Sequence, residues 1–316
     1  KILISRNILV IPNDRSSHQE PKPQGGGLSI VICFILFLLL SHSMGFIEDK
    51  ILFALGVPGL LIGLIGLKDD FNSINPLPRL IIHFLSASLG LYLLGGFPPI
   101  PIFGTQINLG FIGQILAIFY IVWVVNLYNF MDGIDGLASL EAIFIFSSLA
   151  VFISLISVNS DIFLILTFLV GSVLGFLLLN FPKSYIFIGD VGSGFLGIIL
   201  ALISILVSTE VPQLFWTFLV LIGAFVVDST YTLVFRIVSG KKFYEAHSEH
   251  LYQKISRLFN SHVKASVLIL AVNLFWLLPI AYLVTFQKLE GILGVMLAYI
   301  PLILACYSYN TVKEKK

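Results

Sequence analysis

Long apolar segments are the feature that most constrains what this chain can fold into. A helix that crosses a membrane needs about 20 mostly apolar residues. Of the 316 residues, 58% are hydrophobic and only 11% are charged, whereas soluble domains carry about 25% charged residues. The sequence therefore predicts an all-α, polytopic integral membrane helical bundle that forms a single domain over residues 1–316. Ten spans are expected, at 27–47, 51–67, 79–97, 111–128, 138–158, 162–180, 194–209, 212–235, 265–286 and 290–309.

Basic residues are distributed unevenly among the loops that join these spans. Of the 18 Lys and Arg residues, only Lys50 and Lys288 fall in the short or lightly charged loops. The other 16 belong to a second set of loops or to their immediate flanks. Because cytoplasmic loops carry an excess of Lys and Arg, this second set is predicted to face the cytoplasm. Its members are 12–26, 68–78, 129–137, 181–193, 236–264 and the tail 310–316.

Three further features limit the possible functions. The net charge of +1 indicates no nucleic-acid partner. Cys33 and Cys306 each lie in an apolar run and have neither disulfide nor metal-site spacing. The chain starts at Lys1 with a short apolar stretch and no cleavable signal peptide. We therefore expect a further segment, such as another membrane helix, upstream of Lys1.

Four segments on the predicted cytoplasmic side combine acidic or imidazole groups with glycines. They are "GLKDDF" (66–71), "NFMDGIDGLA" (129–138), "NFPKSYIFIGDVGSGFLG" (180–197) and "AHSEHLYQK" (246–254). A carboxylate at a membrane edge is costly unless it faces water, a partner or a cation. A hard divalent cation such as Mg²⁺ relieves repulsion among carboxylates and attracts phosphates. The carboxylates of these segments are Asp69, Asp70, Asp132, Asp135 and Asp190.

The same segments contain other candidates for binding an anionic ligand. "GDVGSG" precedes the span 194–209, so its amides are expected to receive an anionic group at the helix start. His247 and His250 have i, i+3 spacing and would share a helical face. Together with Arg79, Lys241 and Lys242, they would offset phosphate charge. Each feature also has a purely structural interpretation, as a turn, a cap or an interfacial residue, and Asp228 inside the span 212–235 is equally well explained by packing.

Taken together, these motifs resemble those of the polyprenyl-phosphate N-acetylhexosamine-1-phosphate transferases (glycosyltransferase family 4), which include the phospho-MurNAc-pentapeptide translocase. The resemblance runs from "IPNDRSSHQEPKPQGGG" through "KDDF", "NLYNFMDGIDGLA" and "FIGDVGSGFLG" to "KKFYEAHSEHLYQK". The "SSH…PKPQGGG" and "FYEAHSEHLYQ" stretches resemble the bacterial branch that starts O-antigen or related surface glycans. That branch implies eleven spans and a cytoplasmic cleft in the bacterial inner membrane.

The resemblance implies transfer of a sugar 1-phosphate from a UDP-sugar to undecaprenyl phosphate, with release of UMP. It implies Mg²⁺ as cofactor, for which Mn²⁺ is expected to substitute, and a homodimer is possible. Asp190 would be the metal ligand, and Asp69 and Asp70 would lie near the lipid phosphate, with their role as general base left open. The remaining positions carried over are Asp132, Asp135 and Asn129 in the cleft, Phe187 on the uracil, Asn180 near the base, His247 and His250 at the diphosphate and sugar, and Arg79 at the lipid phosphate.

Three alternatives remain. The translocase branch carries a tight His triplet, whereas this chain has "HSEH", which argues against a MurNAc-pentapeptide substrate. The CDP-alcohol phosphotransferases also share "DGxxDG", but "DGIDGLASLEAIF" lacks their following Arg and second acidic pair. A transporter would place its polar groups at the bilayer midplane, often between inverted repeats, and here they lie at one edge. The sequence does not select among GlcNAc, GalNAc, FucNAc and QuiNAc donors.

Overall fold

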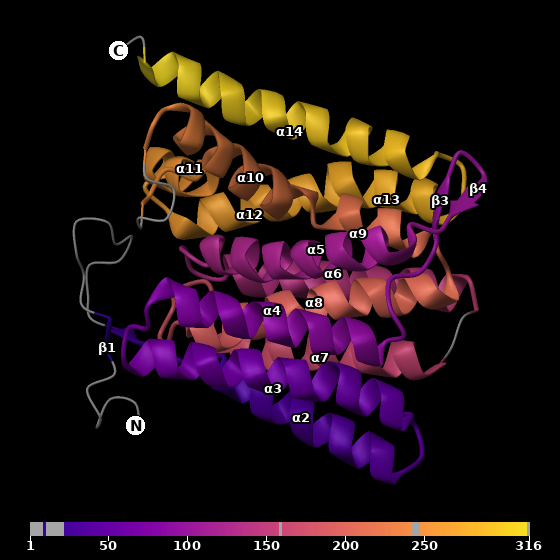
Figure 1. Ribbon diagram of the computed structural model, residues 1–316. Helices are drawn as coiled ribbons and strands as arrows, with labels where there is room; N and C mark the ends of the chain where they lie inside the picture. Colours follow the sequence, from indigo (N-terminus) through magenta and orange to yellow (C-terminus); the bar gives the residue numbers. More distant parts are fainter. Residues whose placement is uncertain (1–8, 11–21, 158–159, 242–246, 315–316) are drawn as a thin grey trace.

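The computed structural model describes residues 9–10, 22–157, 160–241 and 247–314. Long helices that run roughly side by side form the molecule (Figure 1). They are α2 (Leu28–Ser43), α3 (Asp49–Phe71), α4 (Pro76–Leu93), α5 (Gly110–Phe130), α6 (Leu137–Leu155), α7 (Ser160–Asn180), α8 (Gly189–Glu210), α9 (Leu214–Leu221), α10 (Gly223–Val238), α11 (Leu251–Phe259), α12 (His262–Val272), the π-helical turn η1 (Asn273–Leu277), α13 (Leu278–Thr285) and α14 (Gly291–Glu314).

Two short antiparallel hairpins accompany the helices. β1 (Leu9–Val10) pairs with β2 (Lys22–Pro23), and β3 (Ile100–Ile102) pairs with β4 (Thr105–Ile107). They lie at opposite ends of the bundle (Figure 1). The end with β2 also holds the loop residues 72–75, 131–136, 181–188, 239–241 and 247–250, and we call it the polar end. The expectation of an all-α membrane bundle is confirmed.

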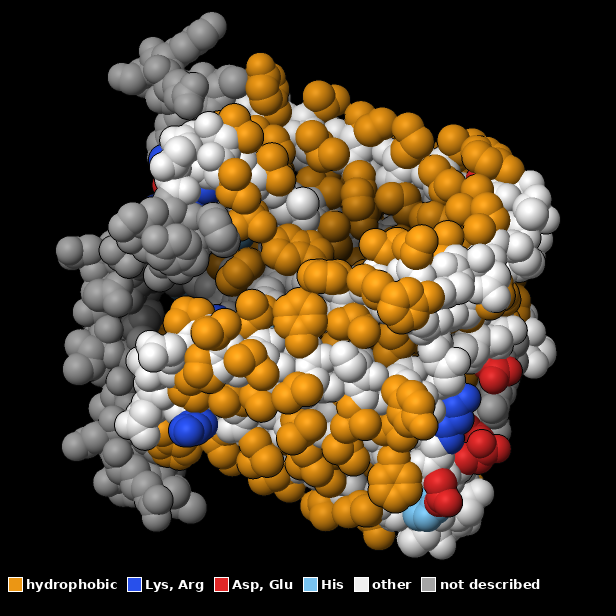
Figure 2. Space-filling view, viewed as in Figure 1, with side chains coloured by type: hydrophobic (Ala, Val, Ile, Leu, Met, Phe, Trp, Pro, Cys, Tyr) orange, Lys and Arg blue, Asp and Glu red, His pale blue; other side chains and the backbone are white. Residues whose placement is uncertain are grey.

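Length and composition support membrane crossing for most of the predicted spans. Among the described residues, eight helices are long and apolar enough to cross a membrane, or nine if α9 and α10, which meet at 65°, form one bent span. Each of the ten predicted segments coincides with a helix or a helix pair, but α2, with 16 residues, is shorter than these. In Figure 2 the charged side chains in view lie towards the two ends, and the surface between them is largely hydrophobic.

Helix α8 forms the centre of the bundle. Its apolar stretch is completely buried, and it packs against α3 and α5 most extensively. A helix that is hydrophobic on all sides lies in a core or spans a membrane, and its complete burial inside the protein places α8 at the core of the bundle. Gly66 of α3 faces the backbone of Asp190, where an added Cβ would lie 2.4 Å from the Asp190 carbonyl oxygen. This close approach brings the ends of α3 and α8 together at the polar end.

The helix boundaries at the polar end differ from those expected. Asp69 and Asp70 lie in the last turn of α3, and Asp190 lies in the first turn of α8. The predicted loops 68–78 and 181–193 are therefore shorter, because helical structure extends into both. The predicted loop 236–264 includes α11, which is followed by Asn260 in the left-handed conformation (φ 47°). Most of 12–26, Lys242 and the end of the tail lie outside the described residues.

Candidate functional site

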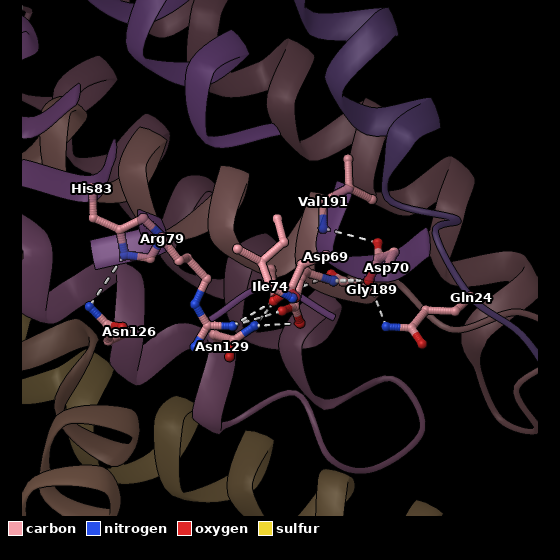
Figure 3. Close-up of polar contacts among 12 residues, drawn as sticks. Gln24, Asp69, Asp70, Ile74, Arg79, His83, Asn126, Asn129, Gly189 and Val191 are labelled. Carbon is pink, nitrogen blue, oxygen red and sulfur yellow. Dashed lines mark hydrogen bonds and ion pairs between the residues drawn. The ribbon is translucent and has the colours of Figure 1, made fainter. Parts of the chain in front are cut away.

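Two carboxylates and one guanidinium form the centre of the polar end (Figure 3). Arg79, near the start of α4, donates through Nη1 to Asp69 Oδ2 at 2.8 Å and to Asp190 Oδ2 at 3.1 Å. Asn129, in the last turn of α5, donates through Nδ2 to Asp190 Oδ1 at 2.8 Å and to Ser193 Oγ at 3.0 Å. Two residues predicted from other segments, Arg79 and Asn129, thus meet the Asp190 side chain directly. We call Asp69, Arg79, Asn129 and Asp190 the central cluster.

Asp70 stabilises the start of α8. Its Oδ1 accepts from the amide of Asp190 at 2.8 Å, and its Oδ2 accepts from the amide of Val191 at 3.2 Å. The first amides of a helix lack partners within the helix, so a carboxylate there satisfies them and complements the helix dipole. Gln24 also donates to Asp70 Oδ1 at 2.6 Å. Gly189 adopts φ +75°, and a Cβ there would lie 2.4 Å from Asp70 Oδ2, so the turn before Asp190 requires glycine.

A small cavity adjoins the central cluster. Its polar lining includes Arg79, His83, Asn126, Asn129 and Asp190. The side chains of Arg79 and Asp190 keep 26% and 29% of their exposure, so an anionic group entering from the polar end can reach them. His83 is buried and was missed from the sequence, although its i, i+4 spacing from Arg79 places both on one face of α4.

Asp135 belongs to a separate group of contacts. Its side chain accepts from the amide of Ser184 at 3.2 Å and lies 3.4 Å from His262 Nδ1 and 4.0 Å from Lys22 Nζ. Burial alone raises the pKa of Asp135, but the hydrogen bonds of His262 and Ser184 outweigh burial, and the pKa lies below its usual value. The carbonyl of Asp135 accepts from Ser266 Oγ at 2.9 Å. Asp135 therefore joins its loop to α12 and to the loop before α8.

Asn180 holds neighbouring loops together. Its Oδ1 accepts from the Gly136 amide at 3.0 Å, and its Nδ2 donates to the Ile186 carbonyl at 2.9 Å. The side chain is buried. Its amide is thus committed to the loop that precedes Phe187.

Asp132 lies in the loop after α5 and is half-buried. No hydrogen bond joins its carboxylate to another residue in the described part of the chain. Burial, followed by the negative charges of Asp190, Asp70 and Asp135, raises the pKa of Asp132 well above its usual value. Asp132 is therefore coupled electrostatically to the carboxylates around it, including Asp190 of the central cluster.

Asp228 caps α11. It accepts from the amides of Leu251 at 2.8 Å and Tyr252 at 2.9 Å, and its Oδ1 lies 3.4 Å from His250 Nδ1. Its position inside a span is explained by this contact with the start of another helix. His250 is the N-cap residue of α11 and is buried.

The prediction that His247 and His250 share a helical face is wrong. His247 lies in the segment before α11 and His250 is the extended residue that begins it, because Asp228 and Gln253 fix the helix start there. Their rings nevertheless lie 5.0 Å apart. Burial, with the neighbouring His250 and Arg236, lowers the pKa of His247 to about 4. At neutral pH the His247 ring is therefore uncharged and offers a hydrogen bond rather than a positive charge.

Phe187 lies at the edge of the polar end. Its amide donates to the Pro23 carbonyl at 2.9 Å, and the Gly26 amide donates to its carbonyl at 2.9 Å. The ring is half-buried, and Lys22 Nζ lies 5.3 Å from its centroid. Phe187 is therefore not a core residue, and a flat ligand could stack on it. Among the predicted cations, Lys241 pairs with Glu249 at 2.9 Å.

The central cluster fits a divalent cation only with help from a ligand. Within the described ranges, no three His, Cys, Asp or Glu side chains are grouped closely enough to hold a metal ion. Protein-bound Mg²⁺ often uses one or two carboxylates, water and substrate phosphates. The Oδ2 atoms of Asp69 and Asp190 converge on one Arg79 nitrogen, so two carboxylates already face a single cation. This donor set suits Mg²⁺ bound together with a phosphate.

Comparison with known proteins identifies the family. The sequence matches the model of glycosyl transferase family 4 over residues 51–208. A phospho-N-acetylmuramoyl-pentapeptide-transferase of Streptococcus pneumoniae serotype 19F (strain G54) is 31% identical over 264 residues, which cover 78% of each chain. The protein of the same description from Streptococcus pneumoniae (strain 70585) is 30% identical over 264 residues with the same coverage. The family match includes the whole central cluster and ends before His247.

Proposed function

Because the chain belongs to glycosyl transferase family 4, we propose that it transfers an N-acetylhexosamine 1-phosphate from a UDP-sugar to undecaprenyl phosphate. The products are undecaprenyl-diphosphate-sugar and UMP. The observation that carries the proposal is the pair Asp69 and Asp190 around Arg79, at the end of helices able to cross a membrane. At such a place a phosphate on a membrane lipid can meet a nucleotide from the cytosol.

The reaction joins two phosphate groups. An oxygen of the lipid phosphate attacks the β-phosphorus of the UDP-sugar, the bond from this phosphorus to the bridging oxygen breaks, and UMP leaves with that oxygen. Since the second pKa of a phosphate monoester is about 6, the nucleophile is already largely ionised at neutral pH and needs no obligatory base. The protein's main task is to position two anions against each other and to stabilise the charge that develops.

The central cluster is suited to that task. Arg79 is assigned to the lipid phosphate, and Asp190, oriented by Asn129, is assigned to the metal. A bound Mg²⁺, or Mn²⁺ in its place, would neutralise the donor diphosphate and polarise its phosphorus–oxygen bonds. Asp69 keeps Arg79 in place, and Asp70 keeps the first turn of α8 in place.

The remaining candidates are assigned to the donor. Phe187 would stack on the uracil, and Asn180 would position its loop through the Ile186 carbonyl. Asp132, with its raised pKa, is the group best suited to exchange a proton. His247 would donate a hydrogen bond to the diphosphate or sugar, and buried His250 would hold it there. Asp135 would fix the loop that carries Asp132.

We place the enzyme in the bacterial inner membrane as a multi-pass protein able to form a homodimer, with the polar end towards the cytoplasm. The uneven distribution of basic residues supports this orientation. The product would begin an O-antigen or a related surface glycan. No nucleic acid takes part.

The names of the relatives suggest a second donor. The relatives above are named for phospho-N-acetylmuramoyl-pentapeptide transfer, which makes a MurNAc-pentapeptide donor the alternative. Against it stands "HSEH", in which one imidazole is buried as a helix cap and the other is half-buried. This arrangement differs from three adjacent histidines.

A panel of donors tests the proposal. Purified protein is given undecaprenyl phosphate, Mg²⁺ and, in turn, UDP-GlcNAc, UDP-GalNAc, UDP-FucNAc, UDP-QuiNAc and UDP-MurNAc-pentapeptide, and UMP is measured. We expect UMP from at least one simple HexNAc donor, and only when the lipid is present. UMP from the pentapeptide donor alone would establish the alternative, and no UMP from any donor would reject both.

A further inference from the structure

A buried carboxyl group lies inside the bundle, away from the central cluster. Glu141, in the second turn of α6, and Asn273, the first residue of η1, each keep 1% of their exposure. Asn273 Nδ2 donates to Glu141 Oε2 at 2.5 Å. Both residues belong to helices able to cross a membrane, where an ionised side chain is costly. Nothing in the proposed reaction uses them.

Two acceptor atoms of this pair lack a donor. Glu141 Oε1 and Asn273 Oδ1 are buried and make no hydrogen bond within the described part of the chain. The nearby hydroxyl of Tyr128 is used, because it donates to the Ala138 carbonyl at 2.5 Å. An ionised Glu141 would therefore leave two buried acceptors unsatisfied and a buried charge opposed by one amide hydrogen, which is strongly unfavourable.

A single proton satisfies both acceptors. We propose that Glu141 is held as a neutral carboxylic acid, whose Oε1–H donates to Asn273 Oδ1 while Asn273 Nδ2 donates to Oε2. The two side chains then form a reciprocal acid–amide pair. The proton comes from solvent as the protein folds, and no further group is required.

The pair joins α6 to the point where the next helix is irregular. η1 lies just before Pro279, whose missing amide and ring interrupt a regular helix. Beyond the pair, α6 and α13 line an apolar groove with Phe144, Phe152 and Leu278 among its walls. The pair therefore links α6 to η1 next to the point where this groove opens between α6 and α13.

α12, which directly precedes η1, contacts the loop of the candidate site. Ser266 of α12 donates to the Asp135 carbonyl, and His262 lies beside the Asp135 carboxylate. α6 begins directly after the same loop. α12 thus holds the loop at Asp135, and η1, which continues α12, holds α6 at Glu141. Glu141 is therefore a positioning residue for segment 131–136. This inference does not depend on the proposed reaction.

Two measurements test it without any activity assay. Glu141→Gln keeps a donor and an acceptor for Asn273, whereas Glu141→Leu keeps neither. Infrared difference spectra between wild type and Glu141→Gln at neutral pH should show the C=O band of a protonated carboxyl that only the wild type has. Hydrogen exchange should be unchanged in 131–136 for Glu141→Gln and faster for Glu141→Leu, with 98–110 at the opposite end unchanged in both.

Each result decides the inference. Absence of the wild-type band would show that Glu141 is ionised and would overturn it. Glu141→Gln that speeds exchange in 131–136 as much as Glu141→Leu would also overturn it, because the reciprocal pair would then not be what positions the loop. If Glu141→Leu does not fold, the band and the Glu141→Gln exchange still decide. Loss of UMP release in the donor panel would reject the proposed function and leave these readouts intact.

Discussion

Arg79 is the cation that Asp69 and Asp190 share. Two carboxylates so close together would repel each other, and the guanidinium lies between them with one nitrogen bonded to both. In the proposed reaction the same guanidinium must also receive a phosphate. Arg79 has 26% of its side chain exposed, so it can do so without leaving the cluster.

The Asp190→Asn variant tests the assignment of the metal ligand. It keeps the size and one oxygen of the side chain but removes the charge. We expect the protein to fold and turnover to fall on the order of 100-fold or more, as when other charge-stabilising groups are removed from active sites. UMP release across a Mg²⁺ titration measures this, with size exclusion as the test of folding.

Asp161→Asn, at the start of α7 and the opposite end of the bundle, is its matched control and should keep wild-type turnover. Full activity of well-folded Asp190→Asn, or wild-type activity undiminished by excess EDTA, would remove Asp190 from the mechanism.

Phe187→Ala tests the nucleotide contact. Removal of a stacking face costs on the order of 1–3 kcal/mol per base, so the KM for the UDP-sugar should rise roughly 5- to 150-fold with a smaller effect on kcat. Phe187→Tyr should be milder because the ring remains. Unchanged kinetics in Phe187→Ala would show that the ring does not contact the donor.

The four residues of the central cluster could be predicted from the sequence, but several of the residues around them could not. Asp69, Asp190 and Asn129 are recognisable because independent motifs place them at one edge of the membrane. Gln24, His83 and Ser193 give no such signal. Gln24 meets Asp70, His83 meets Asn126 and Ser193 meets Asn129 through contacts that spacing along the chain does not reveal. Asp70 could be predicted as a polar residue beside Asp69, but its contact with the α8 amides depends on how α3 packs against α8.

At the scale of helices, close packing of glycines sets the geometry of the site. A Cβ on Gly27 would lie 2.3 Å from Gly192 Cα, and a Cβ on Gly66 would lie 2.4 Å from the Asp190 carbonyl oxygen. Small residues allow helix backbones to approach in this way in membrane proteins. α2 and α3 therefore hold the first turn of α8 from two sides.

Gly66→Ala should disturb the site without touching any functional side chain. The methyl group has no room, so α3 and α8 must separate, at a cost of about 1–3 kcal/mol. Thermal unfolding should occur at lower temperature and UMP release should fall.

The control for this variant is Gly171→Ala in α7, where a Cβ meets no atom within 4 Å. It should be neutral or stabilising by up to about 1 kcal/mol. Equal effects of the two substitutions would contradict the packing argument.

The positions of the spans were predictable, and their ends were not. Apolar length identifies a span, but α8 begins at Gly189 because Asp70 satisfies its first amides, and those contacts are remote in sequence. The apolar pattern does not predict the 65° bend between α9 and α10 either, because Ile222 at the bend lies within a continuous apolar run. The start of α11 likewise depends on Asp228 from another helix.

The whole molecule is apolar around its middle and polar at its ends, as Figure 2 shows for one face. The candidate residues in the described ranges all lie at the polar end, where most of the basic residues were also predicted. A lipid phosphate and a soluble nucleotide can both reach that end. The orientation of the molecule in the membrane therefore decides which pool of nucleotides it uses.

Single cysteines introduced at Lys68, Lys183 and Lys241 test this orientation. The background carries Cys33→Ser and Cys306→Ser. All three positions are exposed at the polar end, and a membrane-impermeant thiol reagent should label them only when it has access to the cytoplasmic side. A cysteine at Lys288, exposed at the opposite end, should show the reverse pattern. Labelling of any polar-end position from outside intact cells would contradict the orientation.

The most direct test of the central claim follows the β-phosphate of the donor. A UDP-sugar that the enzyme accepts is labelled with ³²P at the β-phosphate and incubated with undecaprenyl phosphate, Mg²⁺ and the purified protein. Transfer of a sugar 1-phosphate predicts that the label moves into the lipid fraction while the nucleotide leaves as unlabelled UMP. Label released in UDP, with sugar alone on the lipid, would contradict the account.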